Sequence, residues 1–233
     1  MAYPEHREQD IRHILAAASS SELIIATDDT GVDINLVNSQ LRFHHSFISG
    51  ALPARSRQAG QAIVKACSNK QRSIKKILDL TAGWGVDSLT LAHHGKQVAM
   101  LEQNPLVFAI VAYSLERLAA VEAGAAIARQ MTIENSDARD FLGRLNNDHD
   151  IDCIYLDPMF PGHKSGAKPS KEMQILQAMT GNLGIESCFE QALGKAHKRV
   201  VVKRPAKAGS LDSLKPDMTY REKTIRFDVY LTA

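Results

Sequence analysis

The residues best suited to chemistry lie in the second half of the chain, where an apolar run ends in an acid followed by two prolines and an aromatic residue. The run covers residues 153–156, and the motif behind it is Asp157-Pro158-Met159-Phe160-Pro161. Prolines fix the backbone and remove hydrogen-bond donors, so the oxygens of such a loop can point at a ligand. The exocyclic amine of a nucleic-acid base needs acceptors of this kind, and an aromatic ring can stack on the base. The motif therefore predicts in-line group transfer to a base amine, with Asp157, Pro158 and Phe160 as catalytic residues.

A second motif, residues 77–87, is typical of a strand that runs into a glycine turn and then a helix. Gly83 and Gly85 allow a tight turn and a close approach of a ligand to the backbone. Asp79 stands four residues before Gly83, where its carboxylate would repel a pyrophosphate and attract an ammonium group. Ser88 occupies the place of the third small residue of the dinucleotide-binding pattern. Together these features favour S-adenosylmethionine as the cofactor, with Asp79 near its amino-acid end.

Two further groups of polar residues follow the next predicted strands. Glu102 ends one strand and is placed to accept hydrogen bonds from ribose hydroxyls, a role that dinucleotide enzymes also use. Ser136 or Asp137 follows another strand and could bind an adenine ring. Helix capping is the competing interpretation for Asp137 and for Asp87, since short polar residues are preferred at helix N-caps.

A basic segment suggests where a nucleic acid would lie. Residues 191–211 contain six Lys or Arg residues and no acid, a pattern that can bind phosphates but is also common on solvated surfaces. The predicted RNA contacts are the cations that follow the catalytic motif or a strand end: Lys164, Lys168, Lys203 and Arg204. Phe43 and Phe47 are weaker candidates for stacking on bases.

Two patterns divide the chain. From Lys75 onward, short apolar runs alternate with helical patterns, which is typical of a parallel α/β sheet. The predicted strands are 76–80, 97–101, 131–135, 153–156 and 199–203, and the predicted helices are 88–94, 106–123 and 171–182. An alternating segment at 223–232 predicts a closing antiparallel strand. We therefore expect a catalytic domain at 73–233 and a small α+β extension at 1–72, with a helix at 11–18 and strands at 21–26 and 32–35, that could form an RNA-contacting cap.

Composition narrows the class of protein. The 233 residues carry a formal net charge of +2 and are 44% apolar, and no apolar stretch is long enough to cross a bilayer. The N-terminus has no pattern of a signal peptide. Three widely spaced cysteines and the adjacent histidine pairs 44–45 and 93–94 lack the spacing of a metal site. We expect a cytoplasmic enzyme with no metal and no membrane association.

Four motifs carry a resemblance to a known family: residues 79–87, 100–105, 155–161 and 199–205. In these motifs the chain closely resembles the bacterial ribosomal RNA small subunit methyltransferase J family. The resemblance implies a class I methyltransferase fold, with a mostly parallel seven-stranded sheet, and S-adenosylmethionine as methyl donor. It also implies N2-methylation of guanosine 1516 in 16S ribosomal RNA, free or in the small ribosomal subunit. The cofactor contacts that it implies are Val86, Asp87, Glu102, Gln103, Ser136, Asp137 and Asp157.

Three alternatives remain open at the level of the sequence. N6-methylation of adenine in RNA or DNA would use the same acceptors, so guanine is favoured by the resemblance alone. An NAD-dependent oxidoreductase would need a small residue at the place of Ser88 and a group for hydride transfer. A non-catalytic RNA-binding module would not need the motif at Asp157.

Overall fold

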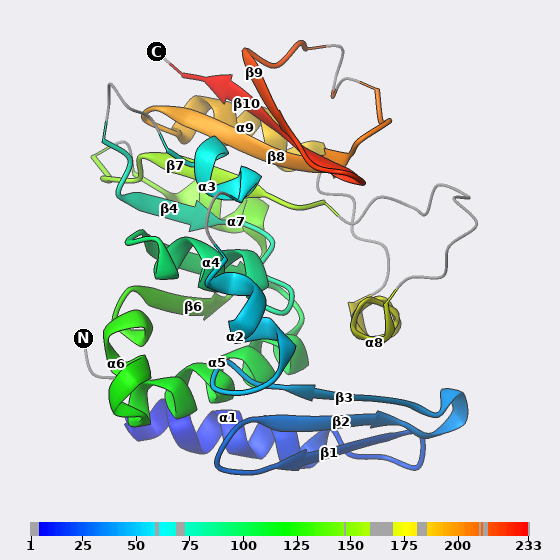
Figure 1. Ribbon diagram of the computed structural model, residues 1–233. Helices are drawn as coiled ribbons and strands as arrows, with labels where there is room; N and C mark the ends of the chain where they lie inside the picture. Colours follow the sequence, from blue (N-terminus) through cyan, green and yellow to red (C-terminus); the bar gives the residue numbers. More distant parts are fainter. Residues whose placement is uncertain are drawn as a thin grey trace.

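The computed structural model describes residues 5–58, 61–68, 73–146, 148–158, 170–180, 186–209, 211 and 214–232. Within these residues a seven-stranded sheet forms the centre of the molecule (Figure 1). Its strands, in spatial order, are β6 (Met131–Asn135), β5 (Gln97–Glu102), β4 (Lys76–Asp79), β7 (Cys153–Leu156), β8 (Arg199–Pro205), β10 (Ile225–Leu231) and β9 (Met218–Arg221). The predicted α/β fold and the five predicted parallel strands are confirmed.

The strand directions explain where a ligand can bind. Strands β6, β5, β4, β7 and β8 are parallel, whereas β10 runs antiparallel between β8 and β9. The predicted closing strand is thus one half of a hairpin. The strand order reverses direction at β4, which lies between β5 and β7, and such switch points open a crevice at the carboxyl ends of the strands.

Alternate residues of the central strands face two separate hydrophobic layers. Ile77, Tyr155 and Val201 face one layer, while their neighbours along the strands, among them Leu78, face the other. The first layer includes α3 (Ala62–Ala66), α4 (Val86–His93) and α5 (Pro105–Ala120), and the second includes α7 (Ala138–Arg144) and α9 (Glu186–Lys195). Because both faces of the central strands are buried, these strands appear in the sequence as nearly continuous apolar runs.

The predicted helix at 106–123 is confirmed as α5, except that it ends at Ala120 and the last three predicted residues lie beyond it. The chain leaves the helical conformation at Val121, where φ is −94° and ψ is 127°, and a short helix α6 (Glu122–Ala128) follows. Gly124 permits this corner because a Cβ atom there would lie 2.4 Å from the carbonyl oxygen of Leu118.

The N-terminal part packs on the same core as the sheet. Helix α1 (Glu5–Ala17) lies along α5, beside an antiparallel sheet of β1 (Leu23–Thr27), β2 (Val32–Leu36) and β3 (Leu41–His45), with a 3₁₀ turn η1 (Val37–Ser39) (Figure 1). Ile11, Val32 and Phe47 are buried in the hydrophobic layer that also contains α5. The boundary at residue 72 stays a prediction, but the extension shares its core with the larger sheet.

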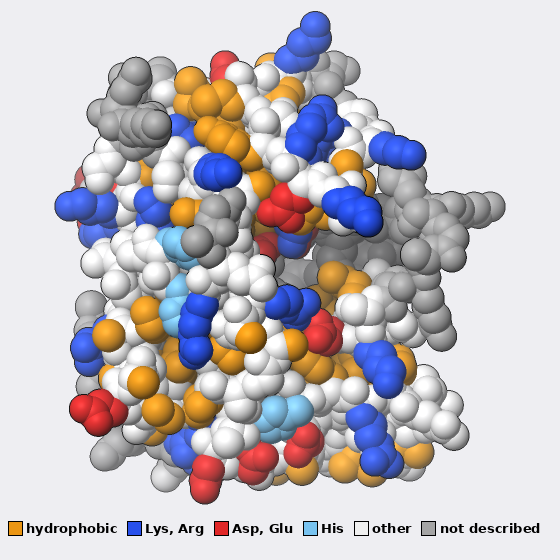
Figure 2. All heavy atoms as spheres, in the orientation of Figure 1, with side chains coloured by type: hydrophobic (Ala, Val, Ile, Leu, Met, Phe, Trp, Pro, Cys, Tyr) orange, Lys and Arg blue, Asp and Glu red, His pale blue; other side chains and the backbone are white. Residues whose placement is uncertain are grey.

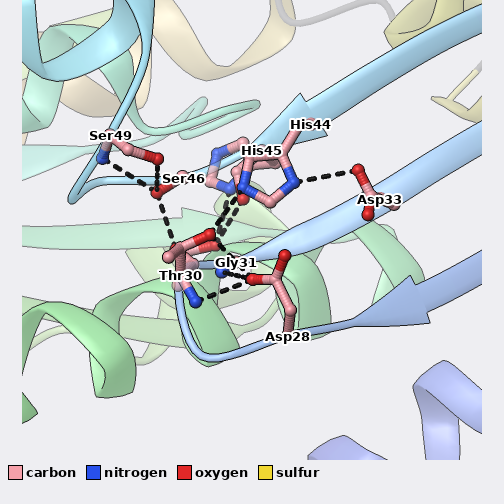
Figure 3. A network of polar contacts seen from close by, with 9 residues as sticks. Asp28, Thr30, Gly31, Asp33, His44, His45, Ser46 and Ser49 are labelled. Atoms are coloured by element: carbon pink, nitrogen blue, oxygen red, sulfur yellow. Dashed lines mark hydrogen bonds and ion pairs between the residues drawn. The ribbon is translucent and has the colours of Figure 1, made fainter.

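Polar contacts fix the turn between β1 and β2 (Figure 3). Asp28 accepts hydrogen bonds from the backbone amides of Thr30 and Gly31. The ring of His44 lies between Thr30 Oγ1, at 3.0 Å, and Asp33 Oδ1, at 2.9 Å. Asp28, Asp33 and His44 each offer a potential metal-ligand atom, and these atoms lie within 4.8 Å of one another. Both ring nitrogens of His44, however, already contact Thr30 and Asp33.

The glycine turn after β4 is closed by the N-terminal part. Gly85 has a left-handed φ of +68°, and a Cβ atom there would lie 2.9 Å from Cζ of Phe47. The buried ring of His45 contacts the backbone oxygen of Trp84 through Nε2 at 2.9 Å and Ser114 Oγ of α5 through Nδ1 at 2.7 Å. The extension therefore holds the turn in place. Phe47 was a candidate for stacking on bases, but it is a fully buried core residue. Phe43, the other candidate, packs against Trp84.

Gly85→Ala tests this close approach. Left-handed backbone costs a residue with a Cβ atom about 1–2 kcal/mol, and the clash with Phe47 should add about 1–3 kcal/mol. Gly95→Ala is the matched control, since Gly95 has a φ of +78° but, in the part of the chain that the structure describes, no atom beyond its chain neighbours lies within 4 Å of the place that its Cβ atom would take. Urea unfolding should show the greater loss of stability for Gly85→Ala. Equal losses for the two variants would mean that Phe47 does not constrain the turn.

Candidate active site

A cavity of about 430 Å³ opens at the carboxyl ends of β4, β5, β6, β7 and β8. Figure 2 shows the side of the molecule where acidic and basic side chains meet around this hollow. The cavity is bordered by most of the predicted cofactor residues: Asp79, Gly83, Val86, Asp87, Glu102, Gln103, Ser136, Asp137 and Asp157. Gly85 lies behind the turn, against Phe47, and is not among the lining residues.

Glu102 organises the glycine turn. Its Oε2 accepts a hydrogen bond from the backbone amide of Gly83 at 3.0 Å, and its Oε1 accepts one from Asn104 at 2.8 Å. The side chain is buried, and burial raises the pKa of its carboxyl group above the ordinary value. Each carboxylate oxygen can accept a second hydrogen bond, so Glu102 can brace the turn and still bind hydroxyl groups in the cavity.

Asp79 is held more deeply than the sequence suggested. Its Oδ1 accepts from the amide of Thr81 at 2.9 Å and its Oδ2 from Ser88 Oγ at 2.6 Å. Only 1% of the surface of Asp79 is exposed, and this burial raises the pKa of its carboxyl group to about 7. Ser88, whose residue type argued against a dinucleotide, is thus also a partner of this carboxylate.

Lys203 connects two other carboxylates at the floor of the cavity. Its Nζ donates to Asp87 Oδ2 and to Asp157 Oδ2, each at 2.8 Å, and Tyr155 Oη donates to the same oxygen of Asp87 at 2.6 Å. The backbone amide of Asp157 donates to Thr81 Oγ1 at 2.7 Å.

The two carboxylates respond in opposite directions to these surroundings. Burial opposes ionisation of both, but Lys203 and the hydroxyl group of Tyr155 hold the pKa of Asp87 below its ordinary value. The pKa of Asp157 is raised by burial and by the nearby charge of Asp87, against the effect of Lys203. Burial likewise raises the pKa of Tyr155, which stays a hydrogen-bond donor.

Helix capping was the competing interpretation for Asp137 and Asp87, and it holds for Asp137. Asp137 is the N-cap of α7 and accepts from the amides of Arg139, at 2.8 Å, and Asp140, at 3.4 Å. Although burial opposes it, the hydrogen bonds with Arg139 keep the pKa of Asp137 low. Asp87 lies in the first turn of α4 without capping it, because Gly85 is the N-cap there. Both acids border the cavity.

Lys203 and Arg204 were predicted to contact RNA from an exposed surface, but both lie in less exposed surroundings. Lys203 points into the cavity toward the two carboxylates, and its side chain is 21% exposed. Arg204 is 7% exposed. Side chains alternate along a strand, so Lys203 and Arg204 face opposite sides of β8. Neither of them offers the open cationic surface that the prediction assumed. Pro158 is buried at the end of β7, and the remaining predictions, Phe160, Lys164 and Lys168, lie outside the described residues.

One wall of the cavity is formed by α8 (Lys171–Thr180), which was not predicted to lie there. Trp84 Nε1 donates to the backbone oxygen of Glu172 at 3.0 Å, and the carboxylate of Glu172 pairs with Arg55 of α2 (Ala51–Ser56) at 3.2 Å. Met173 and Leu176 add apolar surface. The helix itself was predicted, but no local pattern indicated which part of the molecule it would cover.

The sheet order, the glycine turn and the acids at the strand ends define a class I methyltransferase. A family model described as "Putative SAM-dependent methyltransferase" matches residues 9–232. A SAM-dependent methyltransferase of Neisseria gonorrhoeae has a similar structure, with a TM-score of 0.73 and 27% identity over 96% of this chain and 91% of that chain. The chain is therefore an S-adenosylmethionine-dependent methyltransferase.

The particular family follows from curated relatives. The ribosomal RNA small subunit methyltransferase J of Nitrosococcus oceani is 36% identical over 86% of this chain and 84% of its own length. The protein of the same name from Tolumonas auensis is 39% identical over 79% of this chain and 76% of its own length. The chain belongs to the ribosomal RNA small subunit methyltransferase J family, as the sequence motifs predicted, and this membership leaves the oxidoreductase alternative without support.

The cavity fits S-adenosylmethionine. Gly83 keeps the turn open, since a Cβ atom there would approach Leu176 to 3.3 Å. Carboxylates outnumber cations among the buried lining residues, which favours the ammonium and sulfonium groups of the cofactor over a phosphate. Trp84, Leu101 and Leu176 provide apolar surface for an adenine ring.

His45 predicts a dependence of stability on pH. Burial lowers its pKa to about 4, from an ordinary 6.5, so the unfolded chain binds the proton more tightly. Its contribution to stability is complete above pH 6.5 and is lost as the pH falls toward 4, by up to about 3 kcal/mol. Urea unfolding between pH 4 and 7 should show a steeper loss for the wild type than for His45→Gln. Parallel curves would contradict the neutral buried state of His45.

Proposed function

We propose that this enzyme methylates the N2 amine of a guanine in 16S ribosomal RNA, at guanosine 1516 by resemblance to the family. The observation that carries the proposal is the position of Asp157, which directly follows β7, lines the cavity and is held by Thr81 and Lys203. Support also comes from relatives named ribosomal RNA small subunit methyltransferase J. A ribosomal substrate agrees with the expected cytoplasmic location.

The residues around the cavity divide the work. Glu102 and Asp137 would hold the nucleoside part of S-adenosylmethionine, and Asp79 and Asp87 its amino-acid part. When bound, S-adenosylmethionine supplies a methyl carbon that is activated by the positive charge on its sulfur. Asp157 accepts an N–H of the target amine, which turns the nitrogen lone pair away from conjugation with the base. Asp157 or water then takes the proton that the methylated amine releases.

The acceptor geometry alone does not select the base, because the amines of guanine and adenine both present two hydrogens. The test is transfer of labelled methyl from S-adenosylmethionine to 16S ribosomal RNA and to small ribosomal subunits, followed by nucleoside analysis. We expect N2-methylguanosine. N6-methyladenosine would replace the proposed base and keep the mechanism, whereas cofactor binding without transfer to either RNA substrate would overturn the proposed function.

The rim of the cavity offers cations to the RNA backbone. Arg55 and Arg139 line the cavity with side chains that are 51% and 58% exposed, and Lys171 is exposed at the start of α8. Arg55 on α2 and Arg139 on α7 line the cavity together with Asp157, and Lys171 lies in the sequence between the lining residues Ser170 and Glu172. An RNA strand that delivers a base to Asp157 would therefore pass over them, together with Lys164 and Lys168 if those predicted contacts hold.

Asp157→Ala should bind S-adenosylhomocysteine like the wild type and lose methyl transfer. The loss should be about 10²–10⁴-fold in kcat, the usual contribution of a positioned proton acceptor. Single-turnover transfer to small-subunit RNA measures the rate, and calorimetry measures cofactor affinity. A rate equal to that of the wild type would remove Asp157 from the mechanism.

The double variant Arg55→Gln, Lys171→Gln should weaken RNA binding several-fold. Loss of two phosphate contacts should reduce the slope of log affinity against log salt by about 1.5. The matched control is Arg129→Gln, since Arg129 is also exposed but lies between α6 and the amino end of β6. Filter binding of a 16S RNA fragment at several salt concentrations gives both slopes. The rim is not an RNA contact if the double variant and the control behave alike.

A further inference from the structure

We propose that Lys203 is a positioning residue for methyl transfer, which holds the carboxylate of Asp157 toward the cavity and joins it to Asp87 on helix α4. The inference rests on the proposed function, because Asp157 is the group that would contact the amine. It gives a role within the reaction to a lysine that the sequence suggested for RNA binding.

The sheet register delivers Lys203 to this place. Leu156, the last residue of β7, is paired with Val202 of the neighbouring parallel strand β8, so the next residues of the two strands, Asp157 and Lys203, lie side by side. The ammonium group lies 2.8 Å from one oxygen of each carboxylate. On its other side, β8 is fixed by antiparallel pairing of Lys203 with Phe227 of β10. The lysine therefore reaches the cavity from a strand that is paired on both sides.

The bridge connects the two halves of the site. Asp87 belongs to the helix that begins at the glycine turn, and it also accepts from Tyr155 Oη. Asp157 belongs to the loop that would hold the base. A displacement of Lys203 would thus disturb the distance between the cofactor side and the base side, on which in-line transfer depends strongly.

The charges around Asp157 make the role measurable. Burial and the charge of Asp87 on α4 disfavour its ionisation, while Lys203 on β8 favours it, and the charge of Asp157 in turn raises the pKa of Asp79 on β4. Tyr155 on β7 is a neutral donor nearby, and Arg55 on α2 adds a more distant positive charge near Asp87. Without the ammonium group, two carboxylates that now share it would repel each other. The ionised form of Asp157 would then require a higher pH.

Lys203→Met should reduce single-turnover methyl transfer at neutral pH by 10-fold or more. Its acidic limb in the pH–rate profile should move to higher pH by about 1 unit or more, the usual effect of removing an opposite charge at this distance. Lys203→Arg, which retains the charge, should return the limb toward its wild-type position. Affinity for S-adenosylhomocysteine and the unfolding temperature are measured in parallel.

Lys198→Met is the matched control. Lys198 lies just before the same strand and forms an ion pair with Asp152, at 2.6 Å, near the amino end of β7, away from the cavity. Loss of this pair should leave the rate and the acidic limb unchanged. If both lysine variants lower stability to the same extent but only Lys203→Met moves the limb, the effect belongs to the site.

Asp87→Asn provides an independent test if Lys203→Met does not fold. Removing the negative charge of Asp87 should move the acidic limb to lower pH, opposite to the effect of removing Lys203. A limb that stays in place in every folded variant would overturn the inference and leave Lys203 a structural ion pair. Failure of the wild type to form N2-methylguanosine would instead overturn the proposed function, so the two failures are distinguishable.

Discussion

The placing of several carboxylates at one buried edge of the sheet is the constraint on which the rest of the site depends. Asp79 and Asp87 come from a strand and from the helix that directly follows it, whereas Asp157 comes from a loop far along the sequence. Unpaired charges in such surroundings are costly. The structure compensates with hydroxyl groups, backbone amides and the ammonium group of Lys203. These partners set the positions of β4, α4, β7 and β8 relative to one another.

The same constraint explains the choice of ligand. The three carboxylates line the cavity, and a carboxylate oxygen can accept more than one hydrogen bond, so a bound molecule with positive charge completes the compensation. S-adenosylmethionine has two such groups, and family membership establishes it as the cofactor. The N-terminal part contributes from behind, since Phe47 and His45 fix the glycine turn between the core and the cavity.

The sequence was sufficient to predict the sheet and the acids at its carboxyl edge, because buried parallel strands have a clear apolar pattern and their ends meet in space. Asp79, Glu102 and Asp157 were found in this way. The partner of Asp157 was not, since the direction of the Lys203 side chain depends on alternation along β8 and on pairing with two other strands. Docking of Phe47 and of α8 depends on tertiary packing, for which no local pattern exists.

We infer that S-adenosylmethionine binds in the cavity at the carboxyl edge of the sheet, where Glu102 braces the glycine turn. Calorimetric titration of S-adenosylhomocysteine into the wild type and into Glu102→Gln tests it most directly, with the unfolding temperature of each protein as a check of folding. We predict binding of one molecule per chain to the wild type and an affinity at least about 10-fold lower for the variant, equivalent to about 1.4 kcal/mol. Equal affinities in two folded proteins would mean that the cofactor does not contact Glu102 and binds elsewhere.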